Sequence, residues 1–142
     1  MPKTVSMLAG AGLAVGIAFL APAYAATSYY QEFGGAPGMR SMVNDFVNRV
    51  TADPRIKGYF IHTNIPALKA ALTNQFCNLE GGGCTFNMNM HTVHQSLGVT
   101  QAAFNALAND LTITMDNHNV PMAAQNNLLA KLAAMEPQVV TK

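Results

Sequence analysis

Two histidines three positions apart, His91 and His94, offer the clearest opportunity for chemistry in this chain of 142 residues. They stand in the segment from Met90 to Thr100, which reads MHTVHQSLGVT. On a short helix with apolar flanks, a neutral imidazole can present one ring nitrogen to a metal while the other donates a hydrogen bond. The spacing puts both histidines on roughly the same helix face, so each is a candidate ligand. The competing interpretation is a helix with two surface histidines.

The two cysteines, Cys77 and Cys84, are seven positions apart with three glycines between them. Neither belongs to the Cys-x-x-Cys-His pattern that would indicate covalent haem attachment, and the sequence nearby offers too few further ligands for a metal site. In an oxidising compartment a disulfide is favoured over two free thiols. Closing so short a loop would stabilise the fold by roughly 2–3 kcal/mol.

The N-terminal 25 residues have the pattern of an export signal. Lys3 gives a positive start, an apolar run follows from Met7 to Ala21, and the sequence Ala-Tyr-Ala at positions 23–25 is typical of a signal-peptidase site. The alternative is an uncleaved membrane anchor, but the run is shorter than the roughly 20 residues that a spanning helix needs. We therefore expect residues 1–25 to be removed, no stable membrane anchor to remain, and the product to be periplasmic or secreted.

Residues 26–142 are expected to form one domain of modest size. Without Lys3, the eight Lys and Arg residues fall to seven, which equals the seven Asp and Glu residues. This neutral chain lacks the basic stripe of a nucleic-acid binder, and we expect no nucleic-acid partner and a monomer.

The hydrophobic pattern of this domain is helical almost throughout. Apolar residues recur at spacings of three and four, which predicts helices near residues 37–52, 65–79, 101–117 and 121–135. Pro66 stands near the start of the second, Thr100 can cap the third, and Pro137 is predicted to stop the last. The expected fold class is therefore all-α.

Several motifs in this order resemble group 1 truncated haemoglobins. Phe33-Gly34-Gly35 is similar to the turn between their first two helices, and residues 43–60 resemble their Val-x-Asp-Phe to Phe-Phe block without a gap. Met90 stands four residues before His94, as a methionine precedes the iron ligand in that family, and Gly-Val-Thr follows. The resemblance covers nearly all of residues 26–142 and implies a two-over-two helical sandwich around haem b.

The resemblance also implies a set of site residues. It favours His94 over His91 as the ligand of the haem iron, and it places Thr63 and Lys69 at the mouth of the pocket. The side chains that it makes available as haem walls are Phe46, Val47, Phe60, Leu68, Leu72, Phe76, Met90 and Val99. The alternative for each wall residue is an ordinary core position, and a solvated surface position for Lys69. Met88 and Met90 are also candidate axial ligands, although core filling is the commoner role of methionine.

The chain departs from the family on the side of the haem where the gas binds. Val47 stands where the family usually has a tyrosine, Leu72 stands where it has a glutamine, and residues 85–89 are one residue short. These changes predict an apolar distal pocket, unless Gln75 or Tyr59 turns inward as a hydrogen-bond donor.

Two functions are consistent with these residues. The favoured one is a protein that binds a diatomic gas at a five-coordinate haem iron, which would make it a binder rather than an enzyme and would call for a reductase as a partner. The alternative is an exported haem redox protein, either an electron carrier or a peroxidase-like enzyme. Peroxidase chemistry needs a distal acid–base group, and Val47, Leu68 and Leu72 supply none.

Overall fold

The computed structural model describes residues 9–19 and 28–142. The expected cleavage site at residues 23–25 lies outside this part. The helices are α1 (Tyr29–Glu32), α2 (Gly35–Ala52), the 3-10 helix η1 (Lys57–Phe60), α3 (Ile65–Leu79), α4 (Met90–His94), α5 (Gln101–Asn117), α6 (Met122–Ala134) and α7 (Glu136–Val139). The described residues contain no strand, so the all-α expectation is confirmed.

Side-chain caps explain where α3 and α5 begin. The oxygen of Asn64 accepts a hydrogen bond from Ala67 N at 3.0 Å, and Pro66 fills the first turn of α3. The hydroxyl oxygen of Thr100 accepts from Ala103 N at 3.1 Å at the start of α5, as the sequence predicted. Such caps satisfy backbone N–H groups that have no partner inside the helix.

The turn between α1 and α2 depends on glycine. Gly34 and Gly35 have φ values of 90° and 64°, a region that glycine enters without steric cost. Gly38 in the next turn passes so close to Phe33 that a Cβ atom would lie 2.1 Å from the Phe33 carbonyl oxygen. The turn thus brings α1 back across the start of α2.

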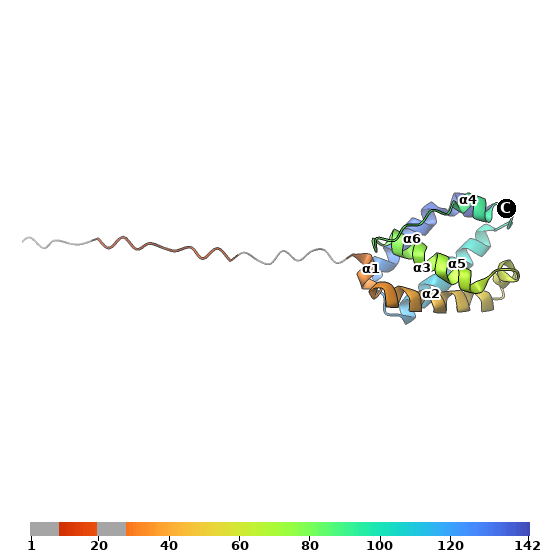
Figure 1. Cartoon of the computed structure of the whole chain (residues 1–142), viewed down its shortest axis with the longest axis horizontal. Helices are drawn as coiled ribbons and strands as arrows, with labels where there is room; N and C mark the ends of the chain where they lie inside the picture. Colours follow the sequence, from red (N-terminus) through yellow and green to blue (C-terminus); the bar gives the residue numbers. More distant parts are fainter. Residues whose placement is uncertain (1–8, 20–27) are drawn as a thin grey trace, which may run out of the picture.

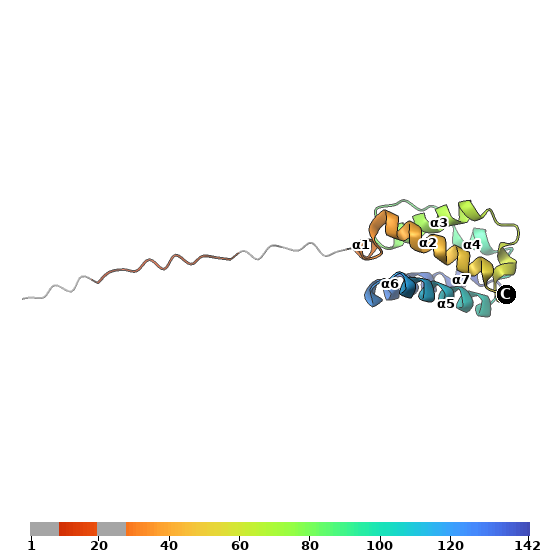
Figure 2. The same ribbon diagram turned by 90° about the horizontal axis from the view of Figure 1, so that it is seen from below.

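The main helices form two layers. Figure 1 colours the helices in chain order, and Figure 2 shows α2 and α3 in one layer and α5 and α6 in the other. Helix α2 packs against both α3 and α5 and so joins the layers. The buried core is formed mainly by Met39, Met42, Val43, Phe46, Val47, Val50, Phe76, Leu111, Met115, Ala124 and Leu128.

The apolar spacing did not predict two short helices, although the resemblance of Phe33-Gly34-Gly35 to a turn between two helices implied the first of them. Helix α1 lies before the Gly-Gly turn, and α7 begins at Glu136 with Pro137 in its first turn. The prediction that Pro137 stops the last helix was therefore incomplete. A proline in the first turn costs no hydrogen bond, so it can start a helix as readily as it ends one.

The predicted disulfide is present. Cys77 and Cys84 are bonded with their Cα atoms 5.7 Å apart, which ties the end of α3 to the segment that leads to α4.

Residues 9–19 lie apart from the helical domain (Figure 1), and their large apolar side chains Leu13, Val15, Ile17 and Phe19 are exposed. No helix within residues 9–19 and 28–142 is both long enough and apolar enough to cross a bilayer.

Candidate haem site

A cavity of about 840 Å³ lies between the two layers, within the size range of sites for small molecules and cofactors. Most of its lining is aliphatic or aromatic. The predicted site residues that line it are Phe46, Phe60, Thr63, Leu68, Leu72, Phe76, Met90, His94 and Val99. Residues separated by as many as 53 positions in the sequence thus meet around one space.

His94 presents the chemistry of this cavity. It is the last residue of α4, a helix of five residues whose start is capped by Asn89, and its side chain is half-buried. Its Nδ1 lies 2.8 Å from the carbonyl oxygen of Met90. A carbonyl oxygen can only accept, so Nδ1 carries the proton and the neutral ring keeps the lone pair of Nε2 free for a metal.

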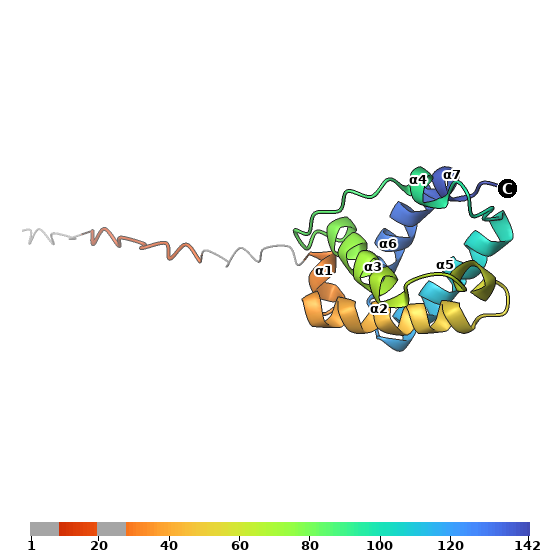
Figure 3. The ribbon, with the colours of Figure 1, turned by 45° about the vertical axis from the view of Figure 1, so that its right-hand side comes forward.

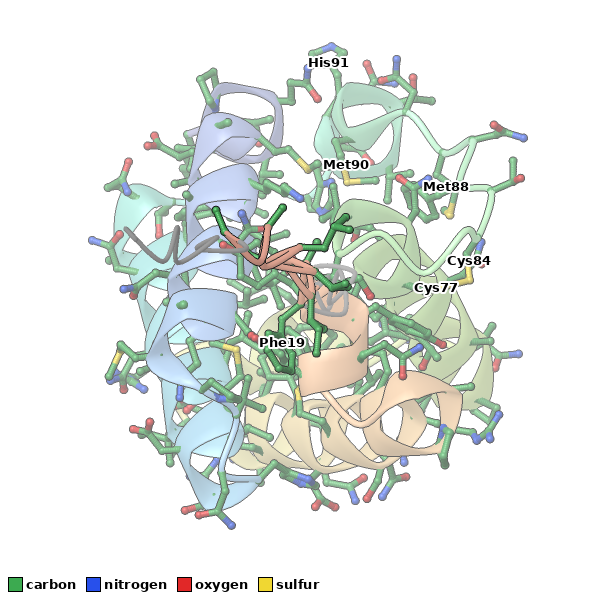
Figure 4. The ribbon with its side chains drawn as sticks, turned by 90° about the vertical axis from the view of Figure 1, so that its left-hand side faces the viewer. Phe19, Cys77, Cys84, Met88, Met90 and His91 are labelled. Atoms are coloured by element: carbon green, nitrogen blue, oxygen red, sulfur yellow. A yellow bond between two sulfur atoms is a disulfide. The ribbon has the colours of Figure 1, made fainter. Side chains whose placement is uncertain are left out.

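His91 does not share this environment. It is exposed, it is not among the residues that line the cavity, and in Figure 4 its side chain lies at the outer edge of the molecule. One residue earlier, Met90 points inward in the same view. Of the two candidate histidines, only His94 meets the cavity.

The segment that carries His94 is fastened by the C-terminal part of the chain. Figure 3 shows α7 beside α4, and the two helices are in contact. After α7, the backbone N–H groups of Thr141 and Lys142 donate to the carbonyl oxygen of Val99 at 2.9 and 3.2 Å. This C-terminal strap, residues 135–142, could not be predicted, since nothing local to these residues indicates their partner.

Phe46 and Phe76 form one wall of the cavity. Their ring centroids are 6.3 Å apart with an interplanar angle of 34°, an arrangement within the favourable range for aromatic pairs. Both rings are almost fully buried, whereas Leu68 and Leu72 on α3 and Phe104 and Leu107 on α5 stay half-buried. The sequence had not singled out the walls contributed by Phe86, Phe104, Leu107, Leu129, Leu132 and Met135.

Two predicted site residues lie elsewhere. Val47 is fully buried but does not line the cavity, because its neighbour Phe46 takes the facing position on α2. Lys69 is not at the mouth, since its Nζ donates to the side-chain oxygens of Asn44 and Asn48 at 2.7 and 3.0 Å. These hydrogen bonds fix the lysine against α2, a direction that spacing along α3 does not reveal.

Two polar side chains considered as inward donors do line the cavity, but both have partners. The Tyr59 hydroxyl donates to the carbonyl oxygen of Gly98 at 3.4 Å. The Gln75 amide lies 3.4 Å from the sulfur of Met90 and 3.7 Å from that of Met135. Gln75 is thus directed toward the helix that carries His94.

A second, more polar cavity of about 610 Å³ lies between α2 and α5. Here Arg55 pairs with Asp53 at 2.7 Å and approaches Asp110 at 3.6 Å. Burial raises the pKa of the Asp110 carboxyl, while the hydrogen bond from Arg55 holds the pKa of Asp53 well below its usual range. His118 also lines this cavity, where it is partly buried and its Nε2 lies 2.7 Å from Asp45 Oδ2. Arg55 thus already supplies a cation between the carboxylates of Asp53 and Asp110.

Comparison with known proteins identifies the class to which this fold and cavity belong. Residues 28–141 match the model of the bacterial-like globin family, and the chain belongs to this family. Membership implies that the protein binds haem, and the cavity fits that group because it combines apolar walls with one imidazole whose Nε2 is free.

Within the globins, the chain is similar to group 1 truncated haemoglobins, as its motifs indicated. It is 30% identical over 115 residues to the one from Mycolicibacterium paratuberculosis, across 80% of this chain and 85% of that protein. It is 28% identical over 98 residues to the one from Tetrahymena pyriformis, across 68% of this chain and 81% of that protein.

Solved structures confirm the two-over-two fold. The truncated haemoglobin of Tetrahymena pyriformis superposes with a TM-score of 0.77 at 24% identity and covers 82% of this chain and 100% of that one. The 2/2 haemoglobin of Synechococcus sp. PCC 7002 superposes with a TM-score of 0.75, with the same identity and coverage.

Proposed function

We propose that the cavity holds haem b, that His94 is the protein ligand of its iron, and that the protein reversibly binds a diatomic gas. The observation that carries this proposal is the hydrogen bond from His94 Nδ1 to the Met90 carbonyl oxygen, which leaves Nε2 for the iron. The bound group would supply an iron with one coordination position open to a gas. The surrounding side chains would exclude water and hold the macrocycle by apolar contact.

Non-covalent haem b is favoured by the state of the cysteines. Both are joined in a disulfide at the end of α3, so neither thiol is available to bond to a vinyl group. The apolar rings and aliphatic chains around the cavity provide the hydrophobic contact that retains a haem without a covalent link.

A gas binder is favoured over the redox alternative by the side chains near the iron position. Leu68 and Leu72 are aliphatic and cannot transfer a proton, as a peroxidase-like reaction requires. Of the two methionines considered as second axial ligands of an electron carrier, Met90 already accepts from the Gln75 amide at 3.4 Å, and Met88 is 49% exposed.

We further propose that the protein is exported after removal of residues 1–25. The apolar run and the Ala-Tyr-Ala site support this proposal. The disulfide supports it as well, because such bonds persist in oxidising compartments. Mass spectrometry of the protein from a periplasmic or secreted fraction would test it, and a mature N-terminus at Ala26 is the expected result.

Replacement of each histidine tests the proposed ligand. His94→Ala should lose stable haem incorporation, while His91→Ala should keep the absorption spectrum of the unsubstituted protein. The same spectra, recorded for the reduced protein with and without carbon monoxide, separate the two functions. A five-coordinate spectrum that shifts with carbon monoxide supports the gas binder. A six-coordinate spectrum that does not respond supports an electron carrier.

A further inference from the structure

Gln75 joins three parts of the chain at the edge of the cavity. It lies on α3 and is only 5% exposed. Its Nε2 is 3.4 Å from Met90 Sδ on α4 and 3.7 Å from Met135 Sδ at the junction of α6 and α7. Figure 4 shows the Met90 side chain pointing inward from α4.

Because the Gln75 amide is buried, its contacts with the two methionine sulfurs matter for the packing around it. A thioether sulfur is a weak acceptor, but a buried N–H group that loses its partner is left with its cost of desolvation uncompensated. Gln75 therefore favours the arrangement in which both sulfurs stay close to it. Since Met135 is the residue before α7, the same amide also connects α3 to the strap that packs on α4.

Met90 transmits this restraint to the candidate iron ligand. Its side chain accepts from Gln75, and its carbonyl oxygen accepts from His94 Nδ1 at 2.8 Å. Hydrogen-bond partners of this kind set the orientation and basicity of a ligating imidazole. A shift of Met90 would therefore change the direction in which His94 Nε2 points.

We propose that Gln75 is a positioning residue: through Met90 and Met135 it fixes the orientation of His94 and so controls how firmly haem is retained. This inference rests on the proposed role of His94 as iron ligand. It assigns to α3 a function on the His94 side of the cavity, in addition to the wall that Leu68 and Leu72 provide.

The chain offers a matched control for this role. Gln125 is a buried glutamine, 3% exposed, whose amide donates to Asp116 Oδ1 and to the Val120 carbonyl oxygen, both at 2.9 Å. It does not line the cavity. Gln75→Leu and Gln125→Leu remove the same group from equally buried positions, but only the first touches the neighbours of His94.

The experiment compares these two variants of the full chain loaded with haem. Gln75→Leu should speed haem transfer to an acceptor apoprotein by about three- to tenfold, the equivalent of one net hydrogen bond. It should also shift the iron–histidine stretching band in the resonance Raman spectrum of the reduced protein. Gln125→Leu should lower the thermal unfolding temperature and leave that band in place.

The outcomes separate this inference from the proposed function. If the unsubstituted protein takes up no haem, both fail. If it takes up haem and Gln75→Leu leaves the band and the transfer rate unchanged, only the positioning role is overturned. If Gln75→Leu does not fold, Met135→Leu removes one acceptor at nearly constant volume and should shift the band in the same way. An unshifted band in Met135→Leu would then overturn the positioning role.

Discussion

The two ends of the helical sandwich have the same apolar pattern but different packing. In one region, which we call the closed end, Met39 and Met42 of α2 and Leu111 and Met115 of α5 have no exposed surface, and the two helices pack against each other. At the other, the cavity end, side chains of similar size remain partly exposed around an internal space, among them Leu68, Leu72, Phe104, Leu107 and Leu132. Helices α2 and α5 contribute to both ends, since Phe46 and Val50 of α2 also line the cavity.

This difference in burial indicates which end of the fold can accommodate a ligand. Burial of apolar surface contributes roughly 25 cal/mol per Å², so several large side chains left half-covered represent stabilisation that the polypeptide alone does not obtain. A bound haem would cover them and complete the core. The closed end, by contrast, is already filled by the protein's own side chains.

The sharpest test replaces one leucine of α5 at each end. Leu111→Ala should lower the free energy of unfolding by about 2–5 kcal/mol whether or not haem is bound, because it opens a cavity in a filled core. Leu107→Ala should cost clearly less in the haem-free protein, since its side chain is only partly buried there. Urea denaturation of the haem-free and haem-loaded forms measures both. Equal losses in the haem-free protein would contradict the comparison.

The disulfide should stabilise the fold without affecting haem. Replacement of Cys77 and Cys84 by serine removes a constraint on a short loop and should cost about 2–3 kcal/mol. The haem spectrum should stay unchanged, because the bond lies beyond the cavity lining. Thermal unfolding and absorption spectra of the double variant provide the check, and a loss of haem binding would contradict it.

A change confined to the cavity should affect gas binding rather than the stability of the fold. Leu72→Gln introduces an amide donor at a lining position, and a hydrogen bond to a partly charged gas is worth about 1.5 kcal/mol or more. Dioxygen release should therefore slow by about tenfold, while release of the less polar carbon monoxide changes little. Stopped-flow dissociation rates of both gases give the comparison. Tyrosine at Val47 is the poorer choice, since that side chain is fully buried outside the cavity and would be overpacked.

The smallest expected effect concerns pH. Burial raises the pKa of Asp110 to about 6, so between about pH 4 and 6 the native protein keeps a proton that the unfolded chain has released. The contribution of Asp110 to the free energy of unfolding should therefore fall as pH rises through this window. Asp110→Asn should flatten the profile and leave the haem spectrum unchanged.

The comparison with the unsubstituted protein is necessary because buried Glu80 also has a raised pKa and acts with the same sign. Denaturation at pH 4.5 and 7 measures the profile for both chains. An equally steep fall in Asp110→Asn would assign the slope to Glu80 or another group.

Helix positions and their starts could be predicted because both depend on local chemistry. The apolar spacing of α2, α3 and α5, Pro66 at the start of α3 and the cap at Thr100 involve residues within four positions of each other. His94 could be singled out because its short helix and its flanking residues resemble those of a known family. These features need no knowledge of the tertiary structure.

The side-chain environments that the sequence could not predict depend on contacts distant in the sequence. Lys69 turns toward Asn44 and Asn48, more than 20 positions away, and His118 meets Asp45 across 73 positions. Val47 follows Phe46 by one residue, a rotation of about 100° around α2. This rotation is enough to direct Phe46 into the cavity and Val47 into the protein core. Met135 became relevant only through its contact with Gln75, 60 positions earlier.

The hydrogen bonds from Thr141 and Lys142 to Val99 also impose an order in time. At about 5–20 residues per second, the roughly 40 residues that separate these partners take about 2–8 s to synthesise. During that interval the growing chain already contains His94 and the cavity-lining residues Leu68 and Leu72 of α3. It still lacks the C-terminal strap that packs against α4. A nascent chain can thus pack its early helices together, whereas the contacts that hold the proposed haem ligand in place form only in the finished polypeptide.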